Sequence, residues 1–480
     1  MTLRILTQLN FSAGENPDAD SGLRFTVRLL RELHRADHTL HFYVLTPEKL
    51  AGACRCLLPR ARITLIPLDL PPRIHGGDFA FNPGQLYSRF DFRKYDIDVL
   101  FLNQPETATA FLNFLNRQTF HLLPAVTYVH WFDTRRPSTP KHRTHHPALL
   151  GALSGMAAST FVGCNSIHGR ARILEQATRW LSSQTASELE KKIRVLPPPV
   201  SAREIAKAKP LRRVRRRRRL PSTMLVNHRL LKYTGVRQLI EHVLPELWIV
   251  RKDFRVIITN PSRVRLPRKL LTVPWARHRT LPAGEYPRRL WDAAIVLAPH
   301  RGTHWSMSTL EAVCAECLPI CNREGFFPEM FAPVLERMPE GSAARFDKYC
   351  LYYRQQLKAK IVQALGELDT LSEFRSQLAR ATRATYDWSC WTRSWLQCFY
   401  DAYASVPTMS PVNPSMLRIV ALLTERRILS KHELLRELRW APKTRTLAWT
   451  AFRKALRAVS RDDPKRPELI LEALDGSEES

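Results

Sequence analysis

Hydroxyl side chains and a carboxylate gather in one stretch, residues 299–331, directly after an apolar run that ends at Ala298. The run, WDAAIVLA, has no polar alternation, which predicts a buried strand. A helix is expected from about Ser306 to Cys317, with Glu311 near its first turn. Ligands bind at the carboxyl ends of strands in open α/β sheets, and helix N-termini attract anions. The stretch is therefore predicted to form a binding site.

Glu311 alone also fits ordinary capping, because a carboxylate near a helix N-terminus offsets the helix dipole. The order of the neighbouring parts favours a ligand site. Glu311 is preceded by a strand, a short loop and a Ser- and Thr-rich helix start. It is followed by two small residues, then by Leu-Pro-Ile at 318–320, and then by a turn through Gly325, Pro328 and Glu329. This order resembles the donor site of retaining GT-B glycosyltransferases, the large family that uses sugar nucleotides.

The resemblance implies roles for several residues of the stretch. The family has two glutamates separated by seven residues, and Glu311 matches the second, which binds the ribose hydroxyls of the nucleotide. The first falls on Thr303, so contact with the donor sugar is expected from Thr303 or His304. Further hydroxyl groups complete the expected donor-binding set: Ser306, Ser308 and Thr309. The departure at Thr303 also leaves open a chain that keeps the fold and has lost the activity.

Two cations follow the strand-like run MLVNH. Arg229 and Lys232 resemble the family's Gly-Arg at a strand end with a Lys a few residues later. Here His228 replaces the Gly, and Thr234 stands nearer the usual Lys position. The resemblance implies that Arg229 and Lys232 bind the donor diphosphate. Two cations can neutralise a departing diphosphate, so no metal is expected.

The first part of the chain offers three more candidates. Gly22 precedes a helix expected over Leu23–Leu33 and would let backbone N–H groups approach a diphosphate, although glycine there also fits simple loop chemistry. The segment TYVHWFD places His130 and Asp133 just past a strand end. A lone histidine is usually structural, but the strand-end position favours a site role. The resemblance implies that such a histidine contacts the transferred sugar.

The composition points to a globular protein with an anionic partner. The chain has 480 residues, and 74 Lys and Arg against 44 Asp and Glu give a net charge of +30. This length predicts two or three domains, and this charge indicates nucleic acid or an anionic membrane. Nine cysteines without an extracellular spacing pattern indicate reduced thiols, and Cys314, Cys317 and Cys321 are expected to pack rather than to bind metal. Without a signal peptide or an apolar run of about 18 residues, we expect a soluble, cytoplasmic protein.

Short apolar runs alternate with helical segments along most of the chain, which predicts a parallel doubly wound sheet. Together with the resemblance, this gives an α/β fold of GT-B type, in which two Rossmann-like domains face each other across a cleft. The expected parts are an N-terminal acceptor domain at 1–200, an Arg-rich linker at 201–220, a donor domain at 221–385, a crossover helix at 386–405, and a small winged helix-turn-helix-like domain at 411–480.

The linker and the last domain carry the prediction of a nucleic-acid partner. Seven arginines lie within Arg212–Arg219, a block that cannot be buried and that favours phosphate contact over simple solvation. In the tail, Ser430 and Glu433 form a capping box, and a basic third helix followed by a strand-like run is typical of a winged helix. A solvated helical tail is the alternative.

Taken together, these features predict a retaining transferase that moves a sugar from a nucleoside diphosphate donor, a UDP-sugar, to a hydroxyl of a hydroxymethylated pyrimidine in DNA. The arrangement resembles bacteriophage DNA-modifying glycosyltransferases, which implies the cytoplasm of an infected bacterium. The base would have to leave the stack to reach the cleft. A monomer that binds no membrane is expected. Three alternatives stay open: a transferase acting on tRNA, one acting on a cell-envelope glycan, and an inactive nucleic-acid binder.

Overall fold

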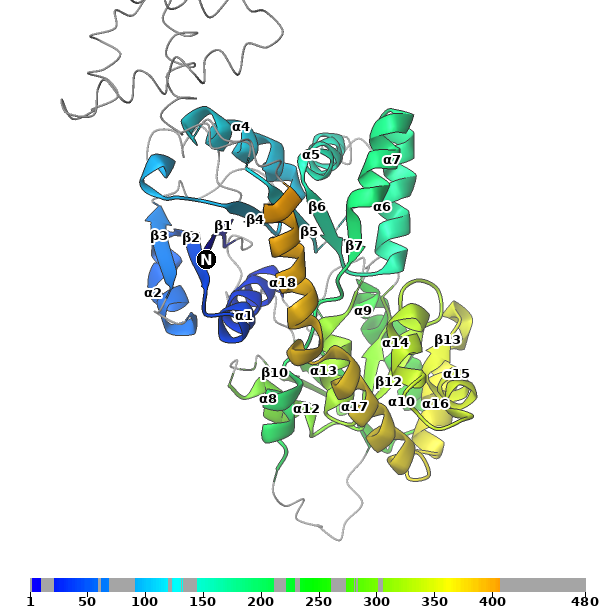
Figure 1. Cartoon of the computed structure of the whole chain (residues 1–480). Coiled ribbons are helices and arrows are strands. Elements are labelled where there is room, and N and C mark those ends of the chain that lie inside the picture. The colour runs from blue at the N-terminus through cyan, green and yellow to red at the C-terminus, as the bar shows by residue number, and fades with distance from the viewer. Residues whose placement is uncertain are drawn as a thin grey trace, which may run out of the picture.

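The computed structural model describes residues 2–9, 21–58, 62–68, 91–119, 123–130, 132, 145–210, 222–228, 234–259, 273–279, 281, 284–300 and 305–405. These residues form two parallel β-sheets, each covered by helices, with one above the other in Figure 1. The block of arginines at 212–219, called the arm below, and the predicted domain at 411–480 lie outside the described residues. No helix of the described part is long and apolar enough to cross a membrane.

The first sheet has seven parallel strands in the order β3-β2-β1-β4-β5-β6-β7. Its strands are β1 Leu3–Gln8, β2 Leu40–Pro47, β3 Ile63–Leu68, β4 Val99–Leu102, β5 Ala125–Val129, β6 Phe161–Cys164 and β7 Ile193–Val195. Ile5 of β1 pairs with Phe42 on one side and with Val99 on the other. All residues of β4 and β5 are buried, as expected for parallel strands with helices on both faces.

The second sheet has six parallel strands in the order β10-β9-β8-β11-β12-β13. Its strands are β8 Ser222–Val226, β9 Phe254–Thr259, β10 Ala276–Arg279, β11 Ile295–Ala298, β12 Leu318–Asn322 and β13 Leu351–Tyr352. The apolar run before the predicted site is therefore a central strand, β11. In both sheets the strand order reverses beside the first strand, between β1 and β4 and between β8 and β11, and such switch points are where open α/β sheets bind ligands.

The helices connect successive strands. In the first half they are α1 Ser21–Ala36, α2 Glu48–Leu57, α4 Ala108–Thr119, α5 His145–Ala158, α6 Ile167–Trp180 and α7 Ser183–Lys192. In the second half they are α8 Ala202–Lys207, α9 Val236–Gln238, a π-helical turn Leu239–Val243, α10 Leu244–Val250, α12 Tyr286–Leu290, α13 Met307–Cys314, α14 Phe327–Leu335, α15 Ser342–Cys350, α16 Leu357–Gly366, α17 Ser372–Tyr386 and α18 Trp388–Ser405. Short 3-10 turns cover Phe92–Lys94, Pro105–Thr107 and Arg354–Gln356.

The helix after β11 is shorter than the sequence suggests. We expected it to reach Cys317, but α13 ends at Cys314 because the chain turns there, with Glu316 in the left-handed region at φ 64°. Glu311 is the fifth residue of α13, so it lies in the second turn rather than in the first. Cys317 then packs with its neighbours in the core of the second half.

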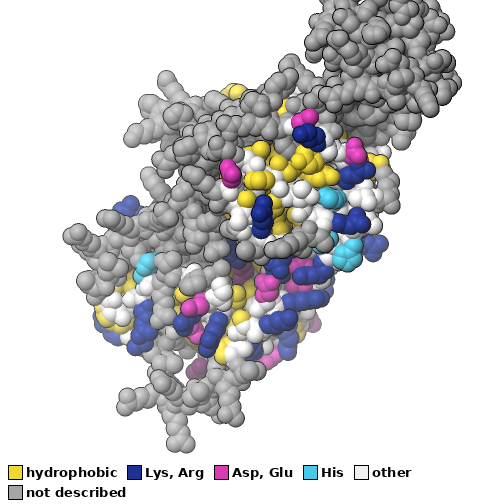
Figure 2. Space-filling view, turned by 90° about the vertical axis from the view of Figure 1, so that its left-hand side faces the viewer, with side chains coloured by type: hydrophobic (Ala, Val, Ile, Leu, Met, Phe, Trp, Pro, Cys, Tyr) yellow, Lys and Arg dark blue, Asp and Glu magenta, His cyan; other side chains and the backbone are white. Residues whose placement is uncertain are grey.

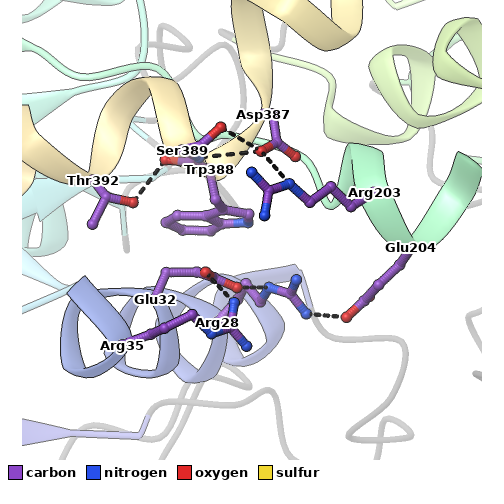
Figure 3. Close-up of polar contacts among 9 residues, drawn as sticks. All are labelled: Arg28, Glu32, Arg35, Arg203, Glu204, Asp387, Trp388, Ser389 and Thr392. Atoms are coloured by element: carbon purple, nitrogen blue, oxygen red, sulfur yellow. Dashed lines mark hydrogen bonds and ion pairs between the residues drawn. The ribbon is translucent and has the colours of Figure 1, made fainter.

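The last helix, α18, returns to the first half and packs on α1, β4 and β5 (Figure 1). Its Trp395 is fully buried, with its ring centroid 5.1 Å from that of Tyr128 in β5. Figure 3 shows the junction at which the chain crosses, with Trp388 of α18 above α1. There Arg28 of α1 contacts Glu204 of α8 at 2.5 Å, so the α1 helix also contacts the second half.

Candidate active site

The start of α13 is fixed by its own hydroxyl groups. The Ser306 side chain caps the helix by accepting a hydrogen bond from the Thr309 N–H at 3.3 Å, and the two hydroxyl oxygens lie 2.7 Å apart. Both residues are buried. Two of the predicted donor-binding residues, Ser306 and Thr309, therefore shape the helix N-terminus, while Ser308 points to another partner described below.

Glu311 is a buried carboxylate whose two oxygens have different surroundings. Its Oε2 accepts a hydrogen bond from the Tyr286 hydroxyl at 2.9 Å. Its Oε1 faces Arg24 of α1, whose Nη2 lies 3.5 Å away. Burial, and then the negative charge of Glu311, raise the pKa of Tyr286 well above its usual value. The phenol therefore stays protonated and holds one carboxylate oxygen in place.

A hydrogen-bonded chain continues from Tyr286 to the end of β8. The Asn227 amide donates to the Tyr286 hydroxyl at 3.0 Å and to the Ser308 carbonyl at 2.7 Å. The Ser308 hydroxyl lies 2.7 Å from Nδ1 of His228. Side chains from β8, α12 and α13 are thereby joined at the switch point of the second sheet.

Two buried histidines follow the strands at this edge, His228 after β8 and His300 after β11. Their rings are perpendicular, with centroids 3.9 Å apart. Burial lowers the pKa of His300 to about 3, and burial followed by the neighbouring His300 lowers the pKa of His228 well below its usual value. Both rings are therefore neutral at pH 7. Within the described part of the chain, Nε2 of His228 and Nδ1 of His300 are buried without a hydrogen-bond partner.

The turn after β8 lies tightly against the end of β11. Gly235 adopts φ 69°, and a Cβ at this position would lie 2.6 Å from the carbonyl oxygen of Pro299. Only glycine takes this conformation readily, and here no side chain fits either. The two strands that flank the switch point are thus joined by backbone contact as well as by the histidine pair.

The first half contributes groups from the carboxyl ends of β1, β4 and β5. Gly22 lies in the first turn of α1 and not ahead of it, because the helix begins at Ser21. The Gly22 carbonyl accepts hydrogen bonds from Thr26 at 3.0 Å and from Asn103 at 3.4 Å. His130 follows β5, and its ring centroid lies 5.7 Å from that of Phe25 in α1. His130 and α1 are therefore neighbours at this edge.

A second carboxylate connects the two halves. Glu329 of α14 accepts backbone hydrogen bonds from Ile167 at 2.5 Å and from His168 at 2.8 Å. These N–H groups belong to the first turn of α6, where a negative charge offsets the helix dipole. Pro328 and Glu329, expected in a turn, lie in the first turn of α14 instead, and Glu329 bridges the halves.

Several predicted site residues lie outside the described residues: Asp133, Arg229, Lys232, Thr303 and His304. The structure brings Ser306, the N-cap of α13, together with Ser308, Thr309 and Glu311 of that helix. It also adds residues that the sequence reasoning missed, namely Arg24, Asn227, Tyr286 and His300. Asn227 and His300 could have been found as polar residues within two positions of the end of an apolar strand, as His228 was. Arg24 and Tyr286 carry no such signal.

Comparison with known proteins defines the fold. No protein-family model and no curated sequence matches the chain. Among solved structures, sucrose-phosphate synthase from Thermosynechococcus elongatus matches with a TM-score of 0.62 and 13% identity, over 84% of this chain and 100% of that chain. An α,α-trehalose 6-phosphate synthase from Burkholderia multivorans matches with a TM-score of 0.54 and 13% identity, over 84% and 100%. TarM matches with a TM-score of 0.57 and 9% identity, over 83% and 99%.

At such low identities the likeness shows the fold and not the reaction. The described part of the chain has the GT-B fold, with two Rossmann-like halves, as the sequence predicted. One fold can host many reactions, so the reaction depends on the residues at the switch points.

Proposed function

We propose that the chain is a glycosyltransferase that takes a sugar from a nucleoside diphosphate donor. One observation carries the proposal: the buried carboxylate of Glu311 stands beside a helix start at a switch point, with Oε2 held by Tyr286 and Oε1 directed to the other half. A fixed carboxylate can accept hydrogen bonds from two neighbouring hydroxyls, which is the chemistry that ribose requires. The fold shared with sucrose-phosphate synthase agrees with this assignment.

The donor's diphosphate would lie at the N-terminus of α13. Orphan backbone N–H groups and the helix dipole stabilise phosphate there. Arg229 and Lys232 would add positive charge as the bond between the sugar and the diphosphate breaks, and no step requires a metal. His130, from the first half, would contact the transferred sugar. Departure of the diphosphate from the face that the acceptor hydroxyl attacks would retain the anomeric configuration.

For the acceptor, we propose a hydroxymethylated pyrimidine in DNA. The net charge of +30 supports a polyanionic acceptor, and residues 212–219 contribute +7 of it. Residues 406–480 contribute only +4, from 14 Lys and Arg against 10 Asp and Glu, which leaves +19 for the rest of the chain. Figure 2 shows Lys and Arg over one side of the molecule, with Asp and Glu between them. Most of the positive charge is therefore outside the tail.

Donor binding is tested first. Titration calorimetry with UDP, ADP and GDP should give saturable binding for one of them, and the matching sugar nucleotide should be slowly hydrolysed without an acceptor. Retention of configuration would be read by NMR of the released sugar. A folded protein that binds none of the three nucleotides would overturn the proposal.

The acceptor is tested separately. Mass spectrometry of nucleosides from cells that make the protein should show a glycosylated hydroxymethylpyrimidine, provided the host DNA carries the hydroxymethyl base. The folded protein should also be retained on duplex DNA more strongly than on tRNA or anionic vesicles. Modified tRNA, or retention on vesicles alone, would assign a different acceptor while leaving the donor chemistry intact.

The arm gives a quantitative version of the acceptor test. Neutralising Arg215–Arg219 should weaken DNA binding, and each lost phosphate contact should lower the slope of log affinity against log salt by about 0.9. Deleting residues 411–480 should have a smaller effect on the slope, since the tail carries less net charge. Donor hydrolysis should not change in either variant. An unchanged slope in both variants would remove the arm and the tail from the DNA contact.

A further inference from the structure

Arg24 is a cation that the fold carries across from the first half to the candidate donor site. It lies in the first turns of α1, at the carboxyl edge of the first sheet, and its guanidinium reaches Glu311 of the second half at 3.5 Å. Its Cζ also lies 5.9 Å from the centre of the Tyr286 ring. Arg24 and Glu311 are 287 positions apart in sequence, so only the assembled fold brings them together.

In the contact between Arg24 and Glu311, the carboxylate is buried and the guanidinium side chain is partly exposed. The Glu311 side chain is 9% exposed and held by Tyr286, whereas the Arg24 side chain is 48% exposed. At 3.5 Å the pair is at the long limit of a hydrogen bond. Because the Glu311 carboxylate is buried, losing its cation would be costly, so Arg24 can leave only when another hydrogen-bond donor takes its place at Oε1. Glu311 can then accept another donor at Oε1 without moving.

Binding of a ribose would replace Arg24 as the hydrogen-bond donor to Glu311. A ribose hydroxyl on Oε1 of Glu311 takes the place that the Arg24 guanidinium occupies in this structure. The same nucleotide would bring two phosphates to the nearby start of α13, and the long Arg24 side chain, 48% exposed, lies at this edge. A guanidinium matches phosphate oxygens in a bidentate geometry and carries its charge at all relevant pH values.

We infer that Arg24 exchanges partners when the donor binds, leaving Glu311 and binding the diphosphate from the side of the first half. This inference rests on the proposed function, and it adds a cation to the donor site from the opposite half of the protein. The residue would couple donor binding to contact between the halves, because the diphosphate would then join α1 to α13. Arg24 is thereby assigned to phosphate recognition and Glu311 to ribose recognition.

The two assignments predict different responses to the number of phosphates. Affinities of uridine, UMP and UDP would be measured by calorimetry for the wild type and for Arg24→Gln, with the adenosine and guanosine series in parallel. Arg24→Gln should bind the preferred diphosphate roughly tenfold more weakly, as expected for an exposed charged hydrogen bond. It should bind the nucleoside equally well or better, since its competitor for Glu311 is gone. The loss should shrink at high salt.

Two variants complete the design. Arg24→Lys should recover part of the diphosphate affinity, because it restores the charge without the bidentate fork. Arg35→Gln makes the same charge change at the far end of α1, where Arg35 pairs with Glu32 at 2.6 Å, and should leave all affinities unchanged. Circular dichroism would confirm that each variant is folded.

The outcomes separate the inference from the proposed function. If the wild type binds a diphosphate and Arg24→Gln binds it equally well, or loses nucleoside and diphosphate affinity to the same extent, the inference is wrong and the proposed function stands. If the wild type binds no nucleotide, both are wrong. A loss that grows from nucleoside to monophosphate to diphosphate supports both.

Discussion

The two halves of the molecule share one architecture but differ at the equivalent edge of their sheets. The switch point of the first half carries buried neutral groups, among them Gln8 and Asn103. That of the second half adds a carboxylate and two imidazoles, Glu311, His228 and His300. Both sheets are parallel and reverse their strand order beside the first strand. The difference in chemistry therefore comes from the side chains placed at the strand ends and not from the fold.

The polar groups of the first half are only partly satisfied. Gln8 donates to Thr107 at 3.3 Å and Asn103 donates to Thr26 at 3.1 Å, while the side-chain carbonyl oxygens of Gln8 and Asn103 have no partner within the described residues. Such acceptors suit neutral hydroxyl groups. The carboxylate of the second half suits the stronger hydrogen bonds that fix a nucleotide. We therefore expect donor binding to depend on the second edge far more than on the first.

The largest expected effect on nucleotide affinity comes from substituting Glu311. Glu311→Ala should weaken nucleotide binding by about 1.5–3 kcal/mol, the range for a hydrogen bond to a charged group, which is roughly 10- to 150-fold. Nucleoside and diphosphate should lose equally, because the carboxylate binds ribose. Gln8→Ala makes a similar truncation at the first edge and should leave the affinity within about twofold of the wild type. Calorimetry on both variants is the measurement. Equal losses in the two variants would remove the distinction between the edges.

The next effect concerns the buried histidines of the second edge. His300 stays neutral in the folded protein because burial lowers its pKa to about 3, whereas in the unfolded chain it titrates near pH 6.5. Below about pH 6.5 the unfolded state therefore binds more protons, and the free energy of unfolding falls as the pH drops toward 3. The slope reaches about 1.4 kcal/mol per pH unit, which gives about 2 kcal/mol between pH 7 and pH 5.

His300→Gln removes this titration and should flatten the acid side of the stability curve. His228, which faces His300, keeps its own lowered pKa and would leave a residual slope. The matched change in the first half is His41→Gln. His41 is only partly buried, and burial together with Arg62 and Arg4 lowers its pKa. Urea denaturation at pH 7.0, 6.0 and 5.0 should show a clear flattening for His300→Gln and a small one for His41→Gln. The reverse order would show that His300 titrates in the folded state.

The sequence predicts the elements of both halves better than it predicts the site. The run LHFYVLTP is strand β2 over its whole length, because an apolar parallel strand is visible locally. Strand β10, ARHR, has no apolar run and was not predicted; it exists because it pairs with β9 at the sheet edge. The sequence predicts the start of α13 near Ser306, while the end of α13 depends on the left-handed Glu316.

At the site itself, local pattern found the residues of α13 and missed those that other elements bring to it. Glu311 stood out by its position after a strand, a loop and a hydroxyl-rich helix start. Arg24 and Tyr286 are ordinary helix residues in sequence, and only their contacts with Glu311 in the folded chain give them a role. No spacing rule connects residues that are far apart in the chain, so this part of the site required the structure.

The smallest expected change in nucleotide affinity is tested with one tyrosine from each half. Tyr286 of the second half donates to Glu311 at 2.9 Å and accepts from Asn227 at 3.0 Å, whereas Tyr128 of the first half donates to the Leu196 carbonyl at 3.0 Å. Each phenylalanine variant removes one hydroxyl and keeps the ring. Tyr286→Phe frees Oε2 of Glu311 to move, so nucleotide affinity should fall by about 0.5–1.5 kcal/mol, roughly two- to tenfold, by the same factor for nucleoside and diphosphate.

Tyr128→Phe should behave in the opposite way. It leaves the Leu196 carbonyl without its donor inside the core, which costs about 1–3 kcal/mol of folding stability, while no group that binds the nucleotide is disturbed. Thermal denaturation and calorimetry on the pair would therefore give a lower melting temperature with normal affinity for Tyr128→Phe, and lower affinity for Tyr286→Phe. If Tyr286→Phe bound the nucleotide as the wild type does, the fixed orientation of Glu311 would not matter, and the carboxylate would have to recognise ribose by charge alone.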